Sequence, residues 1–95
     1  MLEPSDFEWD EAKAASNLKK HGLSFITGAR VFFDSCRIEW DVSRPTDFEA
    51  RYKVVGLVEG RLLSVVFTVR NAKGRIISAR PANISEERRY GHRET

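Results

Sequence analysis

The first third of the chain has the residue spacing of two short helices. Residues 10–21 are rich in good helix formers, with Asp10 placed as an N-cap and Gly22 placed to end the helix. Ser24 can cap a second helix over residues 25–33. Four apolar residues recur at helical spacing in that segment and are predicted to be core: Phe25, Ala29, Phe32 and Phe33.

After Asp34 the hydrophobic residues alternate with polar ones, which is typical of strands. This alternation and the turn residues between the segments predict four strands: 38–42, 51–58, 61–70 and 75–80. Pro81 ends the last strand, and Ser85 is expected to cap a final helix that begins with two glutamates. The order is ααββββα, so residues 1–95 are predicted to form one α+β domain with two N-terminal helices, a four-stranded antiparallel sheet and a C-terminal helix.

The turn between the last two strands decides which face of the sheet carries Arg80. With a four-residue loop over residues 71–74, Arg80 would share a face with the apolar side chains of the strand before it. A one-residue bulge would instead place Arg70, Ser78 and Arg80 together on the polar face. Because an isolated charge is costly to bury, we favour the bulged register.

Composition and charge narrow the class of protein only a little. A length of 95 residues suits one domain, and 41% hydrophobic with 32% charged residues is ordinary for a soluble globular protein. The net charge of +2 is too small to indicate nucleic-acid binding, but the chain from Arg75 onwards carries arginine and no lysine. Guanidinium groups match the geometry of phosphate, so this cluster indicates either an anion-binding surface or a solvated face.

Cysteine use and hydropathy predict a cytoplasmic protein. The single cysteine, Cys36, cannot form an intramolecular disulfide, which fits a reducing compartment. The first residues lack the apolar stretch of a signal peptide, and no apolar run approaches the ~18 residues of a membrane helix. We therefore expect no contact with a membrane.

Sequence motifs for metal, nucleotide or nucleophile chemistry are absent. Two histidines and one cysteine lie too far apart for a zinc site, and there is no phosphate-binding glycine loop or nucleophile elbow. What remains is a set of cationic and hydroxylic side chains: Lys20, His21, Arg51, Arg70, Arg80, Arg88, Arg89 and Tyr90. Cleavage of RNA by its own 2′-hydroxyl requires little more, because the enzyme only moves protons and stabilises a charged phosphorane. No metal ion or other cofactor is expected.

Most of these candidates also have a structural interpretation. His21 is either a proton carrier or a helix-end residue that binds the last carbonyls. Tyr90 accepts a proton only if flanking arginines stabilise its phenolate, and otherwise packs as a structural residue. Trp9 either stacks on an RNA base or anchors the first helix. Arg88 and Arg89 either bind RNA or a partner, or form a solvated helix face.

Three blocks of sequence resemble the BrnT family of bacterial toxins. FEWDEAKAASNLKKHGLSF, from Phe7 to Phe25, resembles the opening of these proteins, and GRLLSVVFTVR, from Gly60 to Arg70, resembles their central strand. RIISARPA, from Arg75 to Ala82, and ERRY, from Glu87 to Tyr90, resemble their C-terminal block. The blocks occur in the family's order over nearly the whole chain.

The resemblance implies a fold similar to RelE-type toxins and a ribonuclease activity that arrests translation. It also implies a BrnA-like antitoxin with a ribbon-helix-helix DNA-binding domain. The complex would repress its own operon, and it would bind the operator DNA only through the antitoxin. The residues that it carries over as functional are Lys20, His21, Arg51, Arg70, Arg80 and Tyr90.

Taken together, the residues and the resemblance predict a metal-independent endoribonuclease. The catalytic candidates are His21, Arg51, Arg70, Arg80 and Tyr90, and the RNA-binding candidates are Lys20, Trp9, Arg88 and Arg89. We expect the antitoxin to cover this basic surface in a two-to-two complex, since a stable interface needs about 800 Å² per partner and a small domain has few such surfaces. The alternative is a non-enzymatic module that binds an acidic partner or nucleic acid through a basic sheet face.

Overall fold

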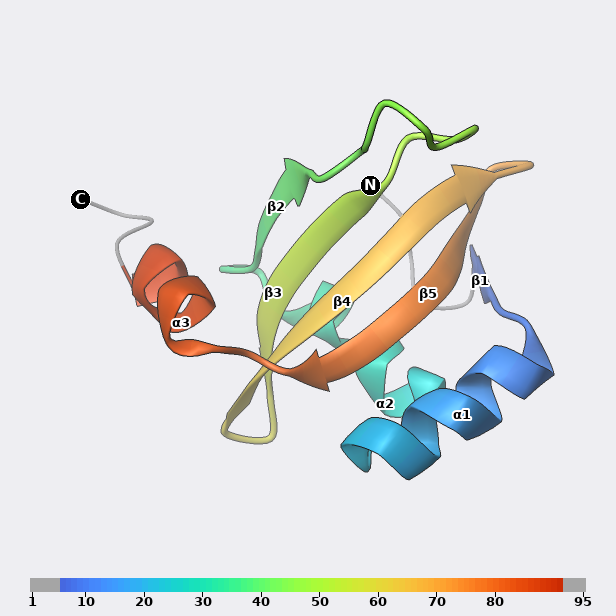
Figure 1. Cartoon of the computed structure of the whole chain (residues 1–95). Helices are drawn as coiled ribbons and strands as arrows, with labels where there is room; N and C mark the ends of the chain where they lie inside the picture. Colours follow the sequence, from blue (N-terminus) through green and yellow to red (C-terminus); the bar gives the residue numbers. More distant parts are fainter. Residues whose placement is uncertain (1–5, 92–95) are drawn as a thin grey trace.

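The computed structural model describes residues 6–91, which form an α+β fold (Figure 1). The elements follow the order β1 (Phe7–Glu8), α1 (Glu11–His21), α2 (Phe25–Ala29), the 3₁₀ helix η2 (Arg30–Phe33), β2 (Ile38–Asp41), β3 (Tyr52–Val58), β4 (Arg61–Arg70), β5 (Lys73–Pro81) and α3 (Ile84–Gly91). The sheet has the order β1-β5-β4-β3-β2, and β1 runs parallel to β5 while the other neighbours are antiparallel. The predicted α+β class is confirmed. The four predicted strands are present as β2 to β5 and pair antiparallel. The predicted strand number is wrong, because the two-residue β1 precedes α1 and makes the sheet five-stranded and mixed.

The first helix begins and ends where its capping residues predict. The Asp10 side chain accepts a hydrogen bond from the Lys13 amide at 3.0 Å, and Gly22 adopts the left-handed conformation with a φ of 71°. Each capping residue interacts only with the backbone of the adjacent helical turn, so the sequence alone defines where α1 begins and ends.

The second helix is shorter than its apolar pattern predicts. Ser24 caps α2 as expected, but the chain tightens into η2 after Ala29. A 3₁₀ helix has three residues per turn, so its side chains leave the stripe that an α-helix would continue. Phe32 is buried, whereas Phe33 is 69% exposed and its predicted place in the core is wrong.

The β4–β5 hairpin has the bulged register that the cost of burying Arg80 predicts. The register shifts by one residue between Val66 and Phe67, and Ile77 is the extra residue of the bulge. Arg80 consequently pairs with Ser64 and lies on the face of the sheet away from the core.

The turn of this hairpin is shorter than predicted. Asn71 and Ala72 both have positive φ, which is the backbone of a two-residue turn between antiparallel strands. Lys73 and Gly74 therefore pair with β4 instead of completing a four-residue loop.

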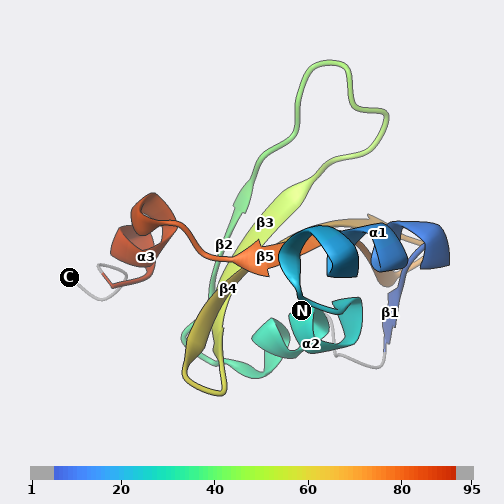
Figure 2. The ribbon, with the colours of Figure 1, turned by 60° about the horizontal axis from the view of Figure 1, so that its bottom comes forward.

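One face of the sheet carries the hydrophobic core. The segment α2–η2 covers this face, and α1 lies beside the β5 edge (Figures 1 and 2). The close approach of α2 requires Gly28, since a Cβ atom there would lie 2.9 Å from the Cβ atom of Ala79. The buried core residues are Leu23, Phe25, Ala29, Val31, Phe32, Val54, Val58, Leu63, Val65, Phe67, Ile76 and Ala79.

A buried asparagine attaches α1 to the edge of β5. The Asn17 side chain donates to the Ala79 carbonyl at 2.8 Å and accepts from the Ala79 amide at 3.2 Å. These two hydrogen bonds take the place of those that a neighbouring strand would make with Ala79. Its amide group also donates to the Leu23 carbonyl at 3.0 Å. A buried polar group left unpaired costs about 1–3 kcal/mol. Asn17 therefore fixes the position of α1, and with it the cations on that helix.

The N-cap of α3 is Asn83 and not the predicted Ser85. The Asn83 side chain accepts from the Glu86 amide at 2.8 Å, and the Glu86 carboxylate accepts from the Asn83 amide at 2.9 Å. This reciprocal pair is a capping box, and it leaves Ser85 inside the first turn.

Candidate functional site

Two of the predicted site residues, Arg70 and Arg80, lie at opposite ends of the polar face of the sheet. Arg70 and Arg80 both lie on this face, as the bulged register requires. Arg80 pairs with Ser64, and a strand rises about 3.3 Å per residue, so residue 64 lies about 20 Å from Arg70 along β4. The two arginines therefore belong to different sites.

At the Arg70 end, three segments of the chain line a pocket of about 130 Å³. These segments are α1, the β4–β5 hairpin and the loop of residues 42–51 between β2 and β3. The lining residues, which we call the arginine pocket, are Lys13, Phe48, Glu49, Arg51, Thr68, Arg70, Arg75 and Ile77. The pocket brings together the predicted Arg51 and Arg70 and adds two further cations and one carboxylate.

The loop of residues 42–51 projects beyond the sheet but has a defined structure (Figure 2). Asp47 accepts hydrogen bonds from the Arg44 amide at 2.7 Å and from the Arg44 guanidinium at 2.9 Å, and it lies 3.6 Å from Nε of Arg51. Thr68 donates through its hydroxyl to the Ala50 carbonyl at 2.6 Å, which ties the end of the loop to β4. These bonds hold the loop beside the arginines.

Glu49 is the carboxylate of the arginine pocket. It accepts two hydrogen bonds from the Arg70 guanidinium, one of them from Nε at 3.1 Å. The hydrogen bond from Arg70 holds the pKa of Glu49 below its ordinary value, so the carboxyl is ionised at neutral pH. The side chains of Arg70 and Glu49 are 47% and 38% exposed, so water and ligands reach this ion pair.

The other two arginines of the pocket also have carboxylate neighbours. Arg75 pairs with Glu8 at 3.0 Å, and Arg51 is near Asp47. Lys13, by contrast, takes part in none of the ion pairs found among residues 6–91. The pocket therefore keeps a positive charge after these pairings.

A more open depression continues from the arginine pocket along α1. It shares Lys13 and Ile77 with that pocket and includes the predicted Lys20 and His21. His21 follows Lys13 by eight residues of helix, which is about 12 Å along the axis. The structure thus places Lys20 and His21 next to the arginine pocket but outside it.

At the other end of the polar face, a buried glutamate holds Arg80. The Arg80 guanidinium donates to the two carboxylate oxygens of Glu86 at 2.8 and 2.9 Å. Lys53 and Ser64 donate to the same carboxylate at 2.8 and 3.1 Å, and the Glu86 side chain is 4% exposed. Burial by itself would raise the pKa of Glu86, but the hydrogen bonds from Arg80, Lys53 and the Asn83 amide lower it to about 2. This ionised carboxylate attaches α3 to the sheet.

Two of the remaining candidates on α3, Tyr90 and Arg89, contact other protein groups. The Tyr90 hydroxyl donates to Oδ2 of Asp34 at 2.7 Å. The guanidinium carbon of Arg89 lies 3.9 Å from the centre of the Trp40 ring, and Arg88 is exposed. The structure does not bring Arg80 or Tyr90 into the arginine pocket, and their part in cleavage stays a prediction.

Trp9 lies in a third place, between α1 and α2. Its Nε1 donates to Glu11 at 3.0 Å, and its ring meets the Phe25 ring edge-on with 6.1 Å between centres. These contacts are those of a packing residue, and RNA binding by Trp9 stays a prediction.

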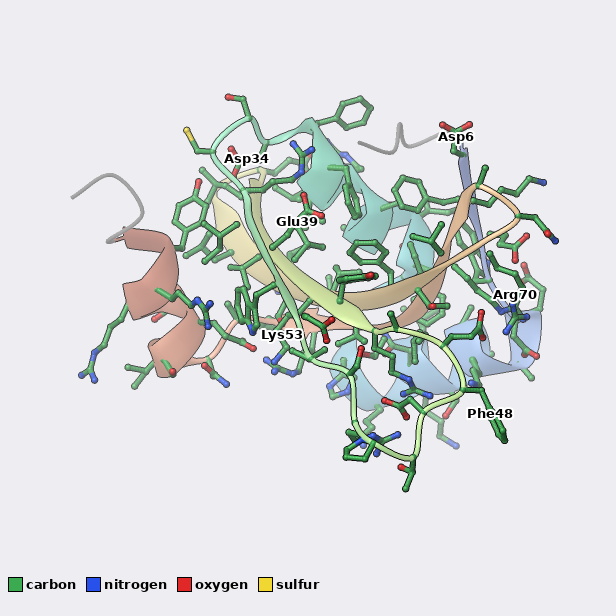
Figure 3. All side chains as sticks on the ribbon, turned by 90° about the horizontal axis from the view of Figure 1, so that it is seen from above. Asp6, Asp34, Glu39, Phe48, Lys53 and Arg70 are labelled. Atoms are coloured by element: carbon green, nitrogen blue, oxygen red, sulfur yellow. The ribbon has the colours of Figure 1, made fainter. Side chains whose placement is uncertain are left out.

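Sequence reasoning named only Arg51 and Arg70 among the residues that line the arginine pocket. The charged and aromatic residues that it missed are Lys13, Phe48, Glu49 and Arg75. Lys13 lies in the predicted first helix and had no role assigned to it, and Arg75 was one member of an arginine-rich stretch. Phe48 and Glu49 belong to a loop without periodicity, where the available signal was one aromatic residue between two acids. Figure 3 shows Phe48 on this loop and Arg70 on the same side of the molecule.

Residues 6–91 contain no group of three or more His, Cys, Asp or Glu side chains placed to hold a metal ion. None of the helices within this range has the length and apolar character needed to cross a membrane. The arginine pocket has four cations and one carboxylate, and this lining favours an anionic ligand over a metal ion.

Comparison with known proteins points to one family. A family model described as ribonuclease toxin, BrnT, of type II toxin–antitoxin system matches residues 9–86. The matched region includes every residue of the arginine pocket and ends at Glu86. No curated protein matches the chain.

Proposed function

Because the chain belongs to the BrnT family of ribonuclease toxins of type II toxin–antitoxin systems, we propose that it cleaves RNA in the arginine pocket without a metal ion. The observation that carries this proposal is the convergence of four cations on a pocket that also holds one ionised carboxylate. Family membership supplies the class of reaction, and the pocket is the place on the molecule best suited to a phosphodiester.

The arginines of the pocket suit the scissile phosphate. Guanidinium groups bind phosphate oxygens in bidentate pairs, and Arg51, Arg70 and Arg75 all line the pocket. An exposed ion pair is worth about 1 kcal/mol or less, so a phosphate can take the place of Glu49 on Arg70. Glu49 then loses its hydrogen bonds from Arg70 and becomes a better proton acceptor.

Cleavage is a transesterification within the RNA. Glu49 accepts the proton of the 2′-hydroxyl, and the 2′ oxygen forms a bond to phosphorus. The bond from phosphorus to the 5′ oxygen breaks, and that oxygen takes a proton from the Lys13 ammonium. The arginines stabilise the additional negative charge of the phosphorane. The products are a 2′,3′-cyclic phosphate and a 5′-hydroxyl end.

The other predicted residues extend the RNA site or position its surroundings. We assign Lys20 and His21 to a neighbouring phosphate of the same strand, because they lie along α1 beyond Lys13. Arg80 and Tyr90 fix α3 through Glu86 and Asp34. The exposed side of α3 then enlarges the basic surface.

Purified protein is expected to cleave single-stranded RNA equally fast with EDTA and with Mg²⁺, because every group in the proposed reaction is a side chain. The measurement is the initial rate on a labelled oligonucleotide, with the product ends identified by mass spectrometry. A Glu49→Gln variant, which keeps the size of the side chain, controls for contaminating nuclease.

Two results would contradict this proposal. Activity that requires Mg²⁺ and disappears with EDTA would show that the reaction uses a metal ion. Tight RNA binding by folded protein without any cleavage would favour the non-enzymatic module.

We also propose that a BrnA-like ribbon-helix-helix antitoxin covers the arginine pocket in a two-to-two complex in the cytoplasm, and that the toxin arrests translation. Expression of the chain alone is expected to stop protein synthesis, and co-expression of the antitoxin to restore it. The mass of the purified complex should equal two copies of each chain. A complex that still cleaves RNA at the full rate would rule out a shared surface.

A further inference from the structure

Phe48 is the most exposed large apolar side chain among residues 6–91, at 106% of its reference surface. It lines the arginine pocket, and in Figure 3 it points outward from the loop. We propose that Phe48 is a stacking platform for a base of single-stranded RNA, next to the phosphate in the arginine pocket. This inference rests on the proposed function, since it names the subsite that holds the substrate's base.

The loop holds Phe48 in place from both sides. Before it, the Asp47 side chain is 4% exposed and is bound by the amide and the guanidinium of Arg44. After it, Glu49 binds Arg70, and the Ala50 carbonyl accepts from Thr68. The backbone around Phe48 is therefore anchored while its ring contacts solvent. A platform fixed in this way loses little conformational entropy when a ligand stacks on it.

The position of Phe48 distinguishes it from the other exposed apolar residues. Leu18 and Ile26 line the groove between α1 and α2, and Phe33 and Leu57 line another pocket, beside Arg30 of η2. Phe48 instead shares its pocket with four cations. An aromatic ring beside a cationic groove is the arrangement that binds single-stranded nucleic acid, with phosphates on the cations and a base on the ring.

Stacking also predicts what kind of RNA is recognised. A phenyl ring has no hydrogen-bonding group, so it tolerates different bases. A base inside a duplex is already stacked on its neighbours and cannot reach the ring without leaving the helix. Phe48 should therefore favour unpaired RNA over duplex RNA with little preference among bases.

The test measures binding separately from cleavage. The probe is a fluorescent single-stranded oligonucleotide with 2′-O-methyl riboses, which lacks the attacking hydroxyl, and the readout is anisotropy. Phe48→Ala is expected to weaken binding about 5- to 150-fold, because one base–aromatic stack is worth about 1–3 kcal/mol. Phe48→Trp should keep the affinity. Phe33→Ala, which removes an exposed phenylalanine away from the pocket, should leave it unchanged.

A second probe, with the same backbone but no bases, shows whether the ring contacts a base. Wild type should bind this abasic strand as weakly as Phe48→Ala binds the normal one, and Phe48→Ala should cause no further loss. Equal binding of the normal strand by wild type and Phe48→Ala would overturn the inference. So would a Phe48→Ala variant that loses binding to the antitoxin but keeps its affinity for RNA. If RNA is cleaved without dependence on Phe48, only this inference fails. If binding depends on Phe48 but unmodified RNA is never cleaved, only the proposed cleavage fails.

Discussion

Replacement of Arg70 by alanine is expected to slow RNA cleavage about 100- to 1000-fold, which is the loss seen when one preorganised donor to a developing oxyanion is removed. Arg70 holds the carboxylate of Glu49 and lines the arginine pocket, so it is placed to donate two hydrogen bonds to the phosphorane. The ion pair is exposed, and its loss should change the free energy of unfolding by about 1 kcal/mol or less. Activity should therefore fall while the fold persists.

The measurement is the single-turnover rate on one labelled oligonucleotide, with thermal unfolding recorded for the same samples. Arg61→Ala is the matched control, because Arg61 is an exposed arginine at the opposite end of the same strand. Arg70→Lys should recover only part of the rate, since an ammonium cannot make the bidentate contact. Near wild-type cleavage by Arg70→Ala, or an equal loss with Arg61→Ala, would refute the assignment of Arg70 to the scissile phosphate.

Replacement of Glu86 by alanine is expected to lower the free energy of unfolding by about 3 kcal/mol, because it leaves two partly buried cations without their counter-ion. Arg80 and Lys53 are 31% and 20% exposed, and both donate to this carboxylate. A domain of this size has a total stability of about 5–14 kcal/mol, so the loss is a large share of it. Urea unfolding measures the change in unfolding free energy, and Glu87→Ala, at the exposed neighbouring residue, is the control. A difference below about 1 kcal/mol would mean that α3 is held by other contacts.

The same carboxylate should make stability depend on pH. The pKa of Glu86 is about 2 in the folded chain against an ordinary value of 4.5, so protons bind the unfolded chain more readily. The stabilisation by Glu86 is therefore complete above about pH 5 and is lost as the pH falls towards 2. The difference in unfolding free energy between wild type and Glu86→Gln should shrink between pH 5 and pH 3. A difference that is constant over this range would contradict the ionised state of Glu86.

Local physical chemistry determined a large part of this protein from sequence. Asp10 and Gly22 define α1 because a cap needs only the backbone within one turn. The alternation from Arg61 to Arg70 defines β4 to the residue, since successive side chains of a strand point to opposite faces. The bulge followed from the free-energy cost of burying Arg80. The three sequence blocks likewise identified the family that the comparison found.

The tertiary structure alone decided which of the cations act together. Alternation and the bulged register together assign Arg70 and Arg80 to one face, about 20 Å apart along the strands. They do not say which side chain from another segment each arginine contacts. Arg80 meets Glu86 and Arg70 meets Glu49, both through contacts between segments distant in sequence. β1 escaped prediction for the same reason, because its two residues form a strand only through pairing with β5. Periodicity in the sequence indicates the direction of a side chain relative to its own helix or strand. A site depends instead on how separate elements pack against one another. Long-range contacts fix this packing, such as the hydrogen bonds of Asn17 with Ala79 and of Thr68 with Ala50.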